Sequence, residues 1–230
     1  MLSMAKLFMV ATPIGNLEDV SLRALRVLRE VASIFCEDTR KTRKLLQRYE
    51  ITTVCFSLHE HSGVGSYQKV LDLLNSGRDV AYVTDAGTPG LSDPGGKLVA
   101  RVLDSGSGHE IIPIPGASAL LAALSIAGVS VDKFVFMGFP PVKNKREKYF
   151  KEICSFDYPV VFYESTYRLE KSLAQLACVD PFLNVIVCGE LTKKFEKVYR
   201  GRIVDVVDVL RKVNTKGEFV VIVYRKYGTK

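Results

Sequence analysis

A glycine-rich loop from Thr84 to Gly96 contains the residues best suited to hold a small ligand: its thirteen residues include four glycines and two prolines. Glycine lets backbone amides approach a ligand and permits a positive φ, while proline makes a loop rigid. Asp85 and Asp93 make the loop acidic. This composition favours a ligand with a cationic end, such as an amino acid or a sulfonium. The structural alternative is a tight turn that needs glycines.

Familiar nucleotide and nucleophile motifs do not match. A P-loop requires Gly, four residues and then Gly-Lys-Ser/Thr, but Gly96-Lys97 has Leu91 at the first glycine position and Leu98 after the lysine. A Rossmann GxGxxG is absent, and Ser118 lacks the GxSxG pattern of a hydrolase nucleophile. We therefore expect Ser118 at a helix N-terminus, where its hydroxyl and amide can reach a ligand.

Two basic clusters suggest contacts with phosphate. Arg40-Lys41-Thr42-Arg43-Lys44 follows a predicted strand, and Lys143-Asn144-Lys145-Arg146 follows another strand and its Phe-Pro-Pro loop. Lys and Arg at helical spacing can follow an RNA backbone. The net charge of +7 also favours a polyanionic partner. The alternative for the first cluster is a solvated helix face.

The composition indicates a soluble globular protein. Hydrophobic residues make up 47% of the 230 residues, and no apolar run reaches the roughly 18 residues that a membrane helix needs. Five cysteines, an odd number without a CxxC pair, favour a reducing compartment and argue against structural zinc. His59-Glu60-His61 is not an HExxH motif and has no evident third ligand, so no metal site is predicted. We expect a cytoplasmic protein with no membrane association.

Short apolar runs alternate with amphipathic stretches along nearly the whole chain, which predicts an α/β fold of two domains with largely parallel sheets. We place the domains at residues 1–116 and 117–230, with a helix over 117–127 opening the second; one continuous sheet is the alternative. The predicted strands are Leu7–Ala11, Ser33–Cys36, Val54–Ser57, Val80–Thr84, Glu110–Ile114, Phe134–Met137, Val160–Tyr163, Val185–Cys188 and Phe219–Tyr224.

Ligands of parallel sheets collect at the carboxyl ends of the strands. The unusual loops here follow the first, fourth and fifth predicted strands, at 11–16, 84–96 and 114–119. We therefore expect these three loops to converge on one ligand.

The loop sequence also carries a family resemblance. The run YVTDAGTPGLSDPG, from Tyr82 to Gly95, resembles the methyl-donor loop of the tetrapyrrole methylase superfamily. More narrowly, the chain resembles the ribosomal RNA small subunit methyltransferase I family. The supporting blocks, in the family's order, are Ala11–Asp19, Glu37–Arg40, His59–His61, Pro115–Ala119, Phe162–Ser165, Gly189–Lys193 and Lys216–Val220. The Glu37–Arg40 and His59–His61 blocks separate this branch from the porphyrin-modifying branches.

The resemblance implies a class III, tetrapyrrole methylase-like methyltransferase that binds S-adenosylmethionine between its two domains and forms a homodimer. It implies 2′-O-methylation of a cytidine ribose in small-subunit (16S) ribosomal RNA, with the RNA or the ribosomal subunit as partner and no metal. Some family members carry a further C-terminal helical segment beyond the last strand.

The matched blocks and basic clusters predict the site residues. Expected donor contacts are Thr12, Asp85, Gly87, Thr88, Ser92, Ser118, Ala119, Tyr163, Leu191 and Glu218. Expected RNA contacts are Arg40, Lys41, Arg43, His59, Lys143 and Arg146. A ribose hydroxyl must lose a proton as it attacks, and the candidates for the base or orienting group are Glu60, Glu190 and Lys193.

Two other functions remain open from the sequence. A methylase acting on a small, tetrapyrrole-like molecule would have a deep acceptor pocket and little affinity for RNA. A non-catalytic RNA-binding protein would not bind the donor. Salt-sensitive RNA binding distinguishes an RNA methyltransferase from a methylase of small molecules. Donor binding distinguishes it from a non-catalytic RNA-binding protein.

Overall fold

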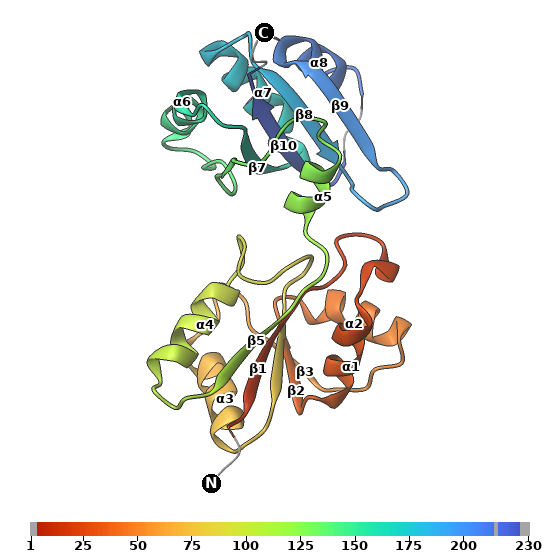
Figure 1. Cartoon of the computed structure of the whole chain (residues 1–230), viewed down its shortest axis with the longest axis vertical. Coiled ribbons are helices and arrows are strands. Elements are labelled where there is room, and N and C mark those ends of the chain that lie inside the picture. Colours follow the sequence, from red (N-terminus) through yellow and green to blue (C-terminus); the bar gives the residue numbers. More distant parts are fainter. Residues whose placement is uncertain (1–3, 214–215, 226–230) are drawn as a thin grey trace. The chain divides into compact units, whose positions relative to one another are not determined.

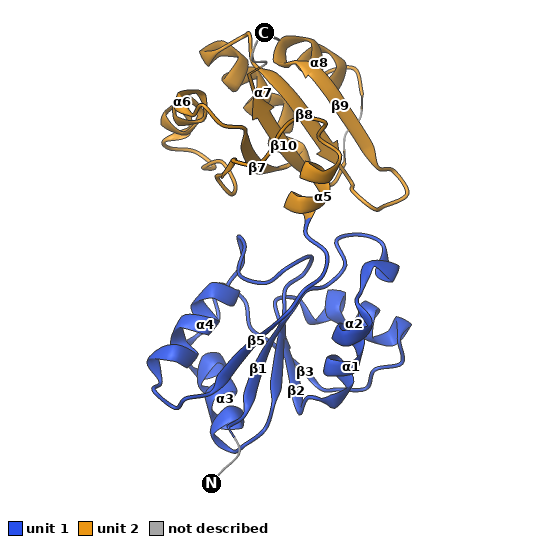
Figure 2. Cartoon of the chain, in the orientation of Figure 1, with its two compact units in different colours: residues 1–118 blue, residues 119–230 orange. Residues whose placement is uncertain are grey.

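The computed structural model describes residues 4–213 and 216–225. The chain divides into two compact units, Met1–Ser118 and Ala119–Lys230, shown in blue and orange in Figure 2. The predicted boundary lay after Gly116, and the division in the structure follows Ser118. Each unit has its own sheet and its own buried core, and the two are described separately below.

The first unit is built on a five-stranded parallel sheet with strand order β3-β2-β4-β1-β5. The strands β2 and β4 are buried at every residue, which explains why their sequences are continuous apolar runs. The five strands are β1 Lys6–Val10, β2 Ser33–Cys36, β3 Cys55–Ser57, β4 Val80–Val83 and β5 Glu110–Ile114.

Helices cover both faces of this sheet (Figure 1). The helices α1, Leu22–Glu30, and α2, Thr39–Arg48, pack on one face, while α3, Val64–Asn75, and α4, Gly95–Asp104, pack on the other. A short 3-10 helix, Leu17–Asp19, precedes α1. This doubly wound arrangement places every loop that follows a strand at the same edge of the sheet.

The second unit has a five-stranded mixed sheet with strand order β6-β7-β10-β8-β9. The strands are β6 Val135–Phe136, β7 Val160–Ser165, β8 Asn184–Gly189, β9 Lys197–Arg202 and β10 Glu218–Tyr224. The helices are α5 Ala119–Ser125, α6 Arg146–Ser155, α7 Thr166–Val179 and α8 Ile203–Leu210. Side chains of α6, α7 and α8 form one core with the sheet.

The prediction of largely parallel sheets is correct for the first unit and wrong for the second. In the second sheet only β6 and β7 pair in parallel, whereas β10 runs antiparallel to both β7 and β8, and β8 runs antiparallel to β9. The strand β9 was not predicted at all, because its sequence KVYRGR has too few apolar residues to show as a buried run. It lies at the edge of the sheet, where charged residues are expected.

Among the residues that the structure describes, no helix has both the length and the apolar character needed to cross a membrane.

Candidate active site

Three loops meet at the carboxyl edge of the first sheet. The amide of Thr12, after β1, donates to the carbonyl of Gly87 at 3.0 Å, and the amide of Gly87 donates back to the carbonyl of Thr12 at 3.0 Å. The Thr12 hydroxyl also donates to the carbonyl of Thr84 at 3.2 Å. Gly87 has a φ of +86°, a conformation that L side chains rarely adopt, so glycine suits this close approach. These bonds join the loop after β1 to the loop after β4.

The loop after β5 completes this group. The Thr88 hydroxyl donates to the carbonyl of Ala117 at 3.1 Å, and Ser118 is half-buried directly after it. Gly87 also lies against Ile14 and Ala117. The structure thus brings together five of the predicted donor residues of the first unit, which are Thr12, Asp85, Gly87, Thr88 and Ser118.

The block that follows β2 is joined to the same loop by reciprocal hydrogen bonds. The Glu37 carboxylate accepts from the Thr84 hydroxyl and from the Asp85 amide, the latter at 3.2 Å. In return, the Asp85 carboxylate accepts from the Asp38 amide at 2.9 Å. β2 and β4 are neighbours in the sheet, so their carboxyl ends emerge side by side. Sequence reasoning had given Glu37 no contact with the donor loop.

Asp85 also forms an ion pair. The Lys41 ammonium lies 2.7 Å from the Asp85 carboxylate, whose side chain is 27% exposed. Lys41 was predicted to contact RNA, and the structure instead pairs it with the carboxylate expected to hold the donor. A cationic ligand approaching Asp85 would therefore meet a carboxylate that already has a cation beside it.

The second acidic residue of the loop, Asp93, shapes the loop itself. Its carboxylate accepts from the amides of Gly90 at 2.9 Å, Leu91 at 3.1 Å and Gly95 at 2.7 Å. Ser92, within this turn, has a φ of +64° and is exposed. The turn leads directly into α4, so Asp93 holds the loop in place at the start of that helix.

The remaining predicted donor residues belong to the second unit. Tyr163 lies on β7 opposite Val220 of β10, and its ring contacts Phe136 and Phe139 with centroid separations of 4.9 and 5.4 Å. Burial raises the pKa of Tyr163 above its usual value, although a hydrogen bond with the backbone of Leu120 opposes this shift. Ala119 and Glu218 are the first residues of α5 and β10, and Leu191 is buried after β8.

Two of the three candidates for the catalytic base form a pair in the second unit. The Lys193 ammonium lies 2.7 Å from the Glu190 carboxylate, and the Glu190 amide donates to the carbonyl of Glu218 at 3.3 Å. Glu190 has a φ of +52°, and its carboxylate lies so close to Gly217 that any side chain at position 217 would collide with it. The ion pair with Lys193 and the backbone hydrogen bond to Glu218 hold Glu190 in place.

The third candidate, Glu60, lies on the first unit between two exposed histidines. Its carboxylate is 3.2 Å from the Lys97 ammonium, and both side chains are more than half exposed. The His59 ring accepts a hydrogen bond from the His61 amide through Nδ1 at 3.2 Å. Within the described residues no group of three or more His, Cys, Asp or Glu side chains is placed to hold a metal ion.

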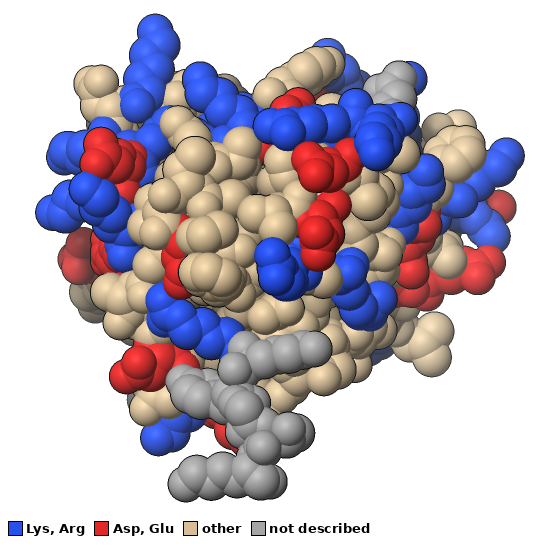
Figure 3. Space-filling model, turned by 90° about the horizontal axis from the view of Figure 1, so that it is seen from above, with Lys and Arg blue, Asp and Glu red and all other residues tan. Residues whose placement is uncertain are grey.

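The basic residues predicted to contact RNA lie in different surroundings. Arg40 and Arg43 are exposed on α2, and the Arg40 guanidinium lies 2.7 Å from Asp38, whose pKa it holds well below the usual value. Lys143 is exposed. Figure 3 shows Lys and Arg side chains over much of one face of the molecule, with Asp and Glu side chains among them.

Arg146, which was predicted to contact phosphate, is buried, unlike the other basic residues of its cluster. It is only 7% exposed, and its guanidinium donates to Gln175 at 2.9 Å, to the Pro141 carbonyl at 2.7 Å and to the Ser172 hydroxyl at 2.7 Å. Basic residues next to it in sequence are exposed, so the sequence pattern could not distinguish Arg146 from them.

The Arg146 network ends on a buried carboxylate. Glu164 of β7 is fully buried and accepts from the Ser172 hydroxyl at 2.5 Å and from the Ser165 amide at 2.8 Å. It also forms an ion pair with Arg168 at 2.9 Å. Arg168 in turn donates to the carbonyl of Pro140 at 3.3 Å. Glu164 therefore anchors both arginines that hold the loop before α6.

Comparisons with known proteins agree with this architecture. The model of the family Tetrapyrrole (Corrin/Porphyrin) Methylases matches residues 6–207. A protein of Halalkalibacterium halodurans named Ribosomal RNA small subunit methyltransferase I is 42% identical over 218 residues, which cover 94% of this chain and 75% of the relative. Its counterparts from Synechocystis and Bacillus subtilis are 42% and 39% identical, each over 96% of this chain and over 79% and 75% of their own lengths.

The chain belongs to the ribosomal RNA small subunit methyltransferase I family.

Solved structures support the fold of this family member. The chain aligns with diphthine synthase at a TM-score of 0.76 and 15% identity, covering 96% of this chain and 90% of that structure. It aligns with the methyltransferase CobJ at 0.72 and 18% identity, covering 99% and 96%. The predicted class III methyltransferase fold is thereby confirmed.

Proposed function

We propose that this chain transfers a methyl group from S-adenosylmethionine to the 2′-hydroxyl of a cytidine ribose in small-subunit (16S) ribosomal RNA. The observation that carries the proposal is the match, at about 40% identity over nearly the whole chain, to proteins named Ribosomal RNA small subunit methyltransferase I. A small-molecule acceptor is less favoured, because the relatives at this level of identity are named for ribosomal RNA.

The residues present fit S-adenosylmethionine, whose sulfonium supplies an activated methyl group. The loop after β4 is held by hydrogen bonds with Thr12, Glu37 and Asp93, and these bonds order its backbone for binding. Asp85 offers a carboxylate to the cationic end of the donor. We propose that Gly87, Thr88, Ser92, Ser118 and Ala119 contact the donor with it, and that Tyr163, Leu191 and Glu218 of the second unit complete the site.

The chain must also orient the ribose and remove its proton. A hydroxyl attacks in line with the bond that breaks, so positioning accounts for much of the rate enhancement. Glu60, Glu190 and Lys193 are the candidates for the base or orienting group. Glu190 is the better candidate of the two carboxylates, because its side chain is 20% exposed whereas that of Glu60 is 69% exposed, although each is paired with a lysine.

The choice between the two carboxylates can be tested by amide substitution. We expect Glu190→Gln to lower kcat by roughly 100-fold or more at saturating RNA and donor, the usual contribution of a general base. Glu60→Gln should lower kcat much less. Rates measured with labelled donor decide this, and a larger loss in Glu60→Gln than in Glu190→Gln would reverse the assignment.

On the RNA side we propose contacts from Arg40, Arg43, His59 and Lys143, with Lys41 shared between RNA and Asp85. We further propose a cytoplasmic homodimer, as the family resemblance implies. Light scattering should give twice the mass of one chain at micromolar concentration, and a single-chain mass over that range would contradict the dimer.

A panel of acceptors tests the proposed function. The protein is incubated with labelled S-adenosylmethionine and, separately, small ribosomal subunits, large ribosomal subunits and a tetrapyrrole such as uroporphyrinogen. We expect label only in the RNA of the small subunits. Label in the tetrapyrrole, with none in RNA, would support the small-molecule alternative instead.

A further inference from the structure

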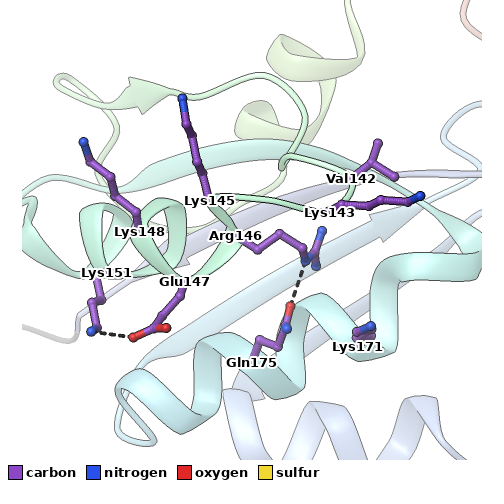
Figure 4. A pocket seen from close by; sticks show the side chains of 9 residues that line it. All are labelled: Val142, Lys143, Lys145, Arg146, Glu147, Lys148, Lys151, Lys171 and Gln175. Atoms are coloured by element: carbon purple, nitrogen blue, oxygen red, sulfur yellow. Dashed lines mark hydrogen bonds and ion pairs between the residues drawn. The ribbon is translucent and has the colours of Figure 1, made fainter.

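A groove between the start of α6 and the side of α7, in the second unit, is strongly basic (Figure 4). It encloses about 730 Å³ and contains six cationic side chains and one carboxylate, a local excess of five positive charges. The net charge of the whole chain is +7. The residues that line it are Val142, Lys143, Lys145, Arg146, Glu147, Lys148, Lys151, Lys171 and Gln175.

The floor of the groove is the buried guanidinium of Arg146. The three groups that accept hydrogen bonds from this guanidinium, on Gln175, Pro141 and Ser172, are neutral. Within the described residues Arg146 forms no ion pair, and it reaches the buried carboxylate of Glu164 only through the Ser172 hydroxyl. A buried cation without an adjacent anion is costly. An anionic ligand in the groove would therefore stabilise it.

Four of the five lysines around the groove form no ion pair among the residues that the structure describes. Lys151 pairs with Glu147 at 2.6 Å, but the structure shows no ion pair for Lys143 or Lys171 among the residues it describes. In Figure 4, Lys143 extends beside the Arg146 guanidinium from the loop before α6, while Lys171 comes from α7 next to Gln175. Lys145, directly before α6, and Lys148, within α6, extend outward.

Hydrogen bonds within the second unit hold the loop that forms one wall of the groove. Arg146 and Arg168 donate to the carbonyls of Pro141 and Pro140, and both arginines are anchored on Glu164, directly or through Ser172. Lys145, with a φ of +66°, then leads into α6. A site whose backbone is ordered in advance loses less conformational entropy on binding.

We propose that this groove binds the phosphodiester backbone of the RNA substrate, with Lys143 and Lys171 on opposite sides of a phosphate. Lys and Arg side chains are the usual partners of phosphate oxygens, and such contacts position the nucleic acid without reading its sequence. The inference rests on the proposed function and extends it, because Lys171 lies 28 residues beyond Lys143 and belongs to neither basic cluster of the sequence.

The test compares two double variants of the full chain that remove equal charge. The groove variant, Lys143→Ala with Lys171→Ala, removes two lysines that line the groove. The control variant, Lys133→Ala with Lys212→Ala, removes two exposed lysines of the same unit that lie outside it. Binding to a fragment of small-subunit RNA is measured by fluorescence anisotropy over a range of salt concentrations. We expect the groove variant to bind more weakly, with a log–log salt slope flatter by roughly 1.4 to 1.8 units, since each phosphate contact contributes about 0.7 to 0.9.

The control variant should keep nearly the parent slope. If the salt slope flattened equally in both variants, RNA binding would depend only on the overall positive charge of the chain, and the inference would be overturned. A groove variant with the same salt slope as the parent would also overturn it. Weaker binding to intact small subunits with unchanged binding to free RNA would point to a ribosomal protein and would also overturn it.

Methylation assays separate this inference from the proposed function. With small subunits as acceptor, the groove variant should raise KM while kcat stays near the parent value, because the groove holds RNA away from the reacting atoms. If the parent methylates the subunits and the groove variant shows the parent KM and slope, the groove inference alone is wrong. If the parent methylates no RNA, the proposed function is wrong, and the salt slopes still decide whether the groove binds a polyanion.

Discussion

Replacing Glu164 by alanine is expected to lower the free energy of unfolding by about 3–5 kcal/mol, the usual loss when one partner of a buried ion pair is removed. Glu164 is fully buried, and its carboxylate is bonded to Arg168, Ser172 and the Ser165 amide. Without it, Arg168 loses its partner and the buried Arg146 loses the carboxylate that it reaches through Ser172. Urea unfolding followed by circular dichroism measures the change.

Glu170, on α7 of the same unit, provides the matched control. It is exposed and pairs with Arg211 at 3.2 Å, so Glu170→Ala should lower stability by about 1 kcal/mol or less. The Glu164→Ala variant should also bind RNA less tightly, because the loop before α6 loses its anchor. If Glu164→Ala lowered the free energy of unfolding by less than about 1 kcal/mol, this would contradict the view that the buried carboxylate stabilises the second unit.

Replacing Asp85 by alanine is expected to weaken S-adenosylmethionine binding by roughly 10- to 100-fold, because a hydrogen bond to a charged group contributes about 1.5–3 kcal/mol. The competing interpretation is that Asp85 serves only to hold Lys41 and the amide of Asp38. Calorimetric titration with the donor gives the affinity, and circular dichroism checks that the fold is intact.

Lys41→Ala distinguishes these two interpretations. If Asp85 binds the cationic end of the donor, removing the competing ammonium should leave donor affinity unchanged or raise it. If the Lys41–Asp85 pair instead orders the loop, Lys41→Ala should weaken donor binding as much as Asp85→Ala does. Equal losses in the two variants would therefore contradict direct contact between Asp85 and the donor.

The sequence predicted the first unit more fully than the second, for physical reasons. A doubly wound parallel sheet is built from local βα units whose buried strands are continuous apolar runs, and β2 and β5 match their predicted bounds. In the second unit, β10 inserts between β7 and β8, from which it is distant in sequence. Such antiparallel pairing depends on nonlocal contacts, and the charged edge strand β9 has no apolar periodicity to mark it.

At the site, the sequence identified the loops but not the bonds between them. That the loops after β1, β4 and β5 meet follows from the topology of a parallel sheet, and the hydrogen bonds among Thr12, Gly87 and Thr88 agree with it. The Lys41–Asp85 pair, the burial of Arg146 and the approach of Lys171 to the groove depend on side-chain directions across separate elements. No pattern in the sequence carries that information.

The chemical position of the transferred methyl group decides whether this chain is a ribose methyltransferase. Small ribosomal subunits are labelled with the protein and S-adenosylmethionine, the RNA is digested to nucleosides, and the product is identified by chromatography and mass spectrometry. We expect label in 2′-O-methylcytidine, because the acceptor is proposed to be a ribose hydroxyl of a cytidine. Label on a base, or label confined to a small molecule or a protein, would contradict it.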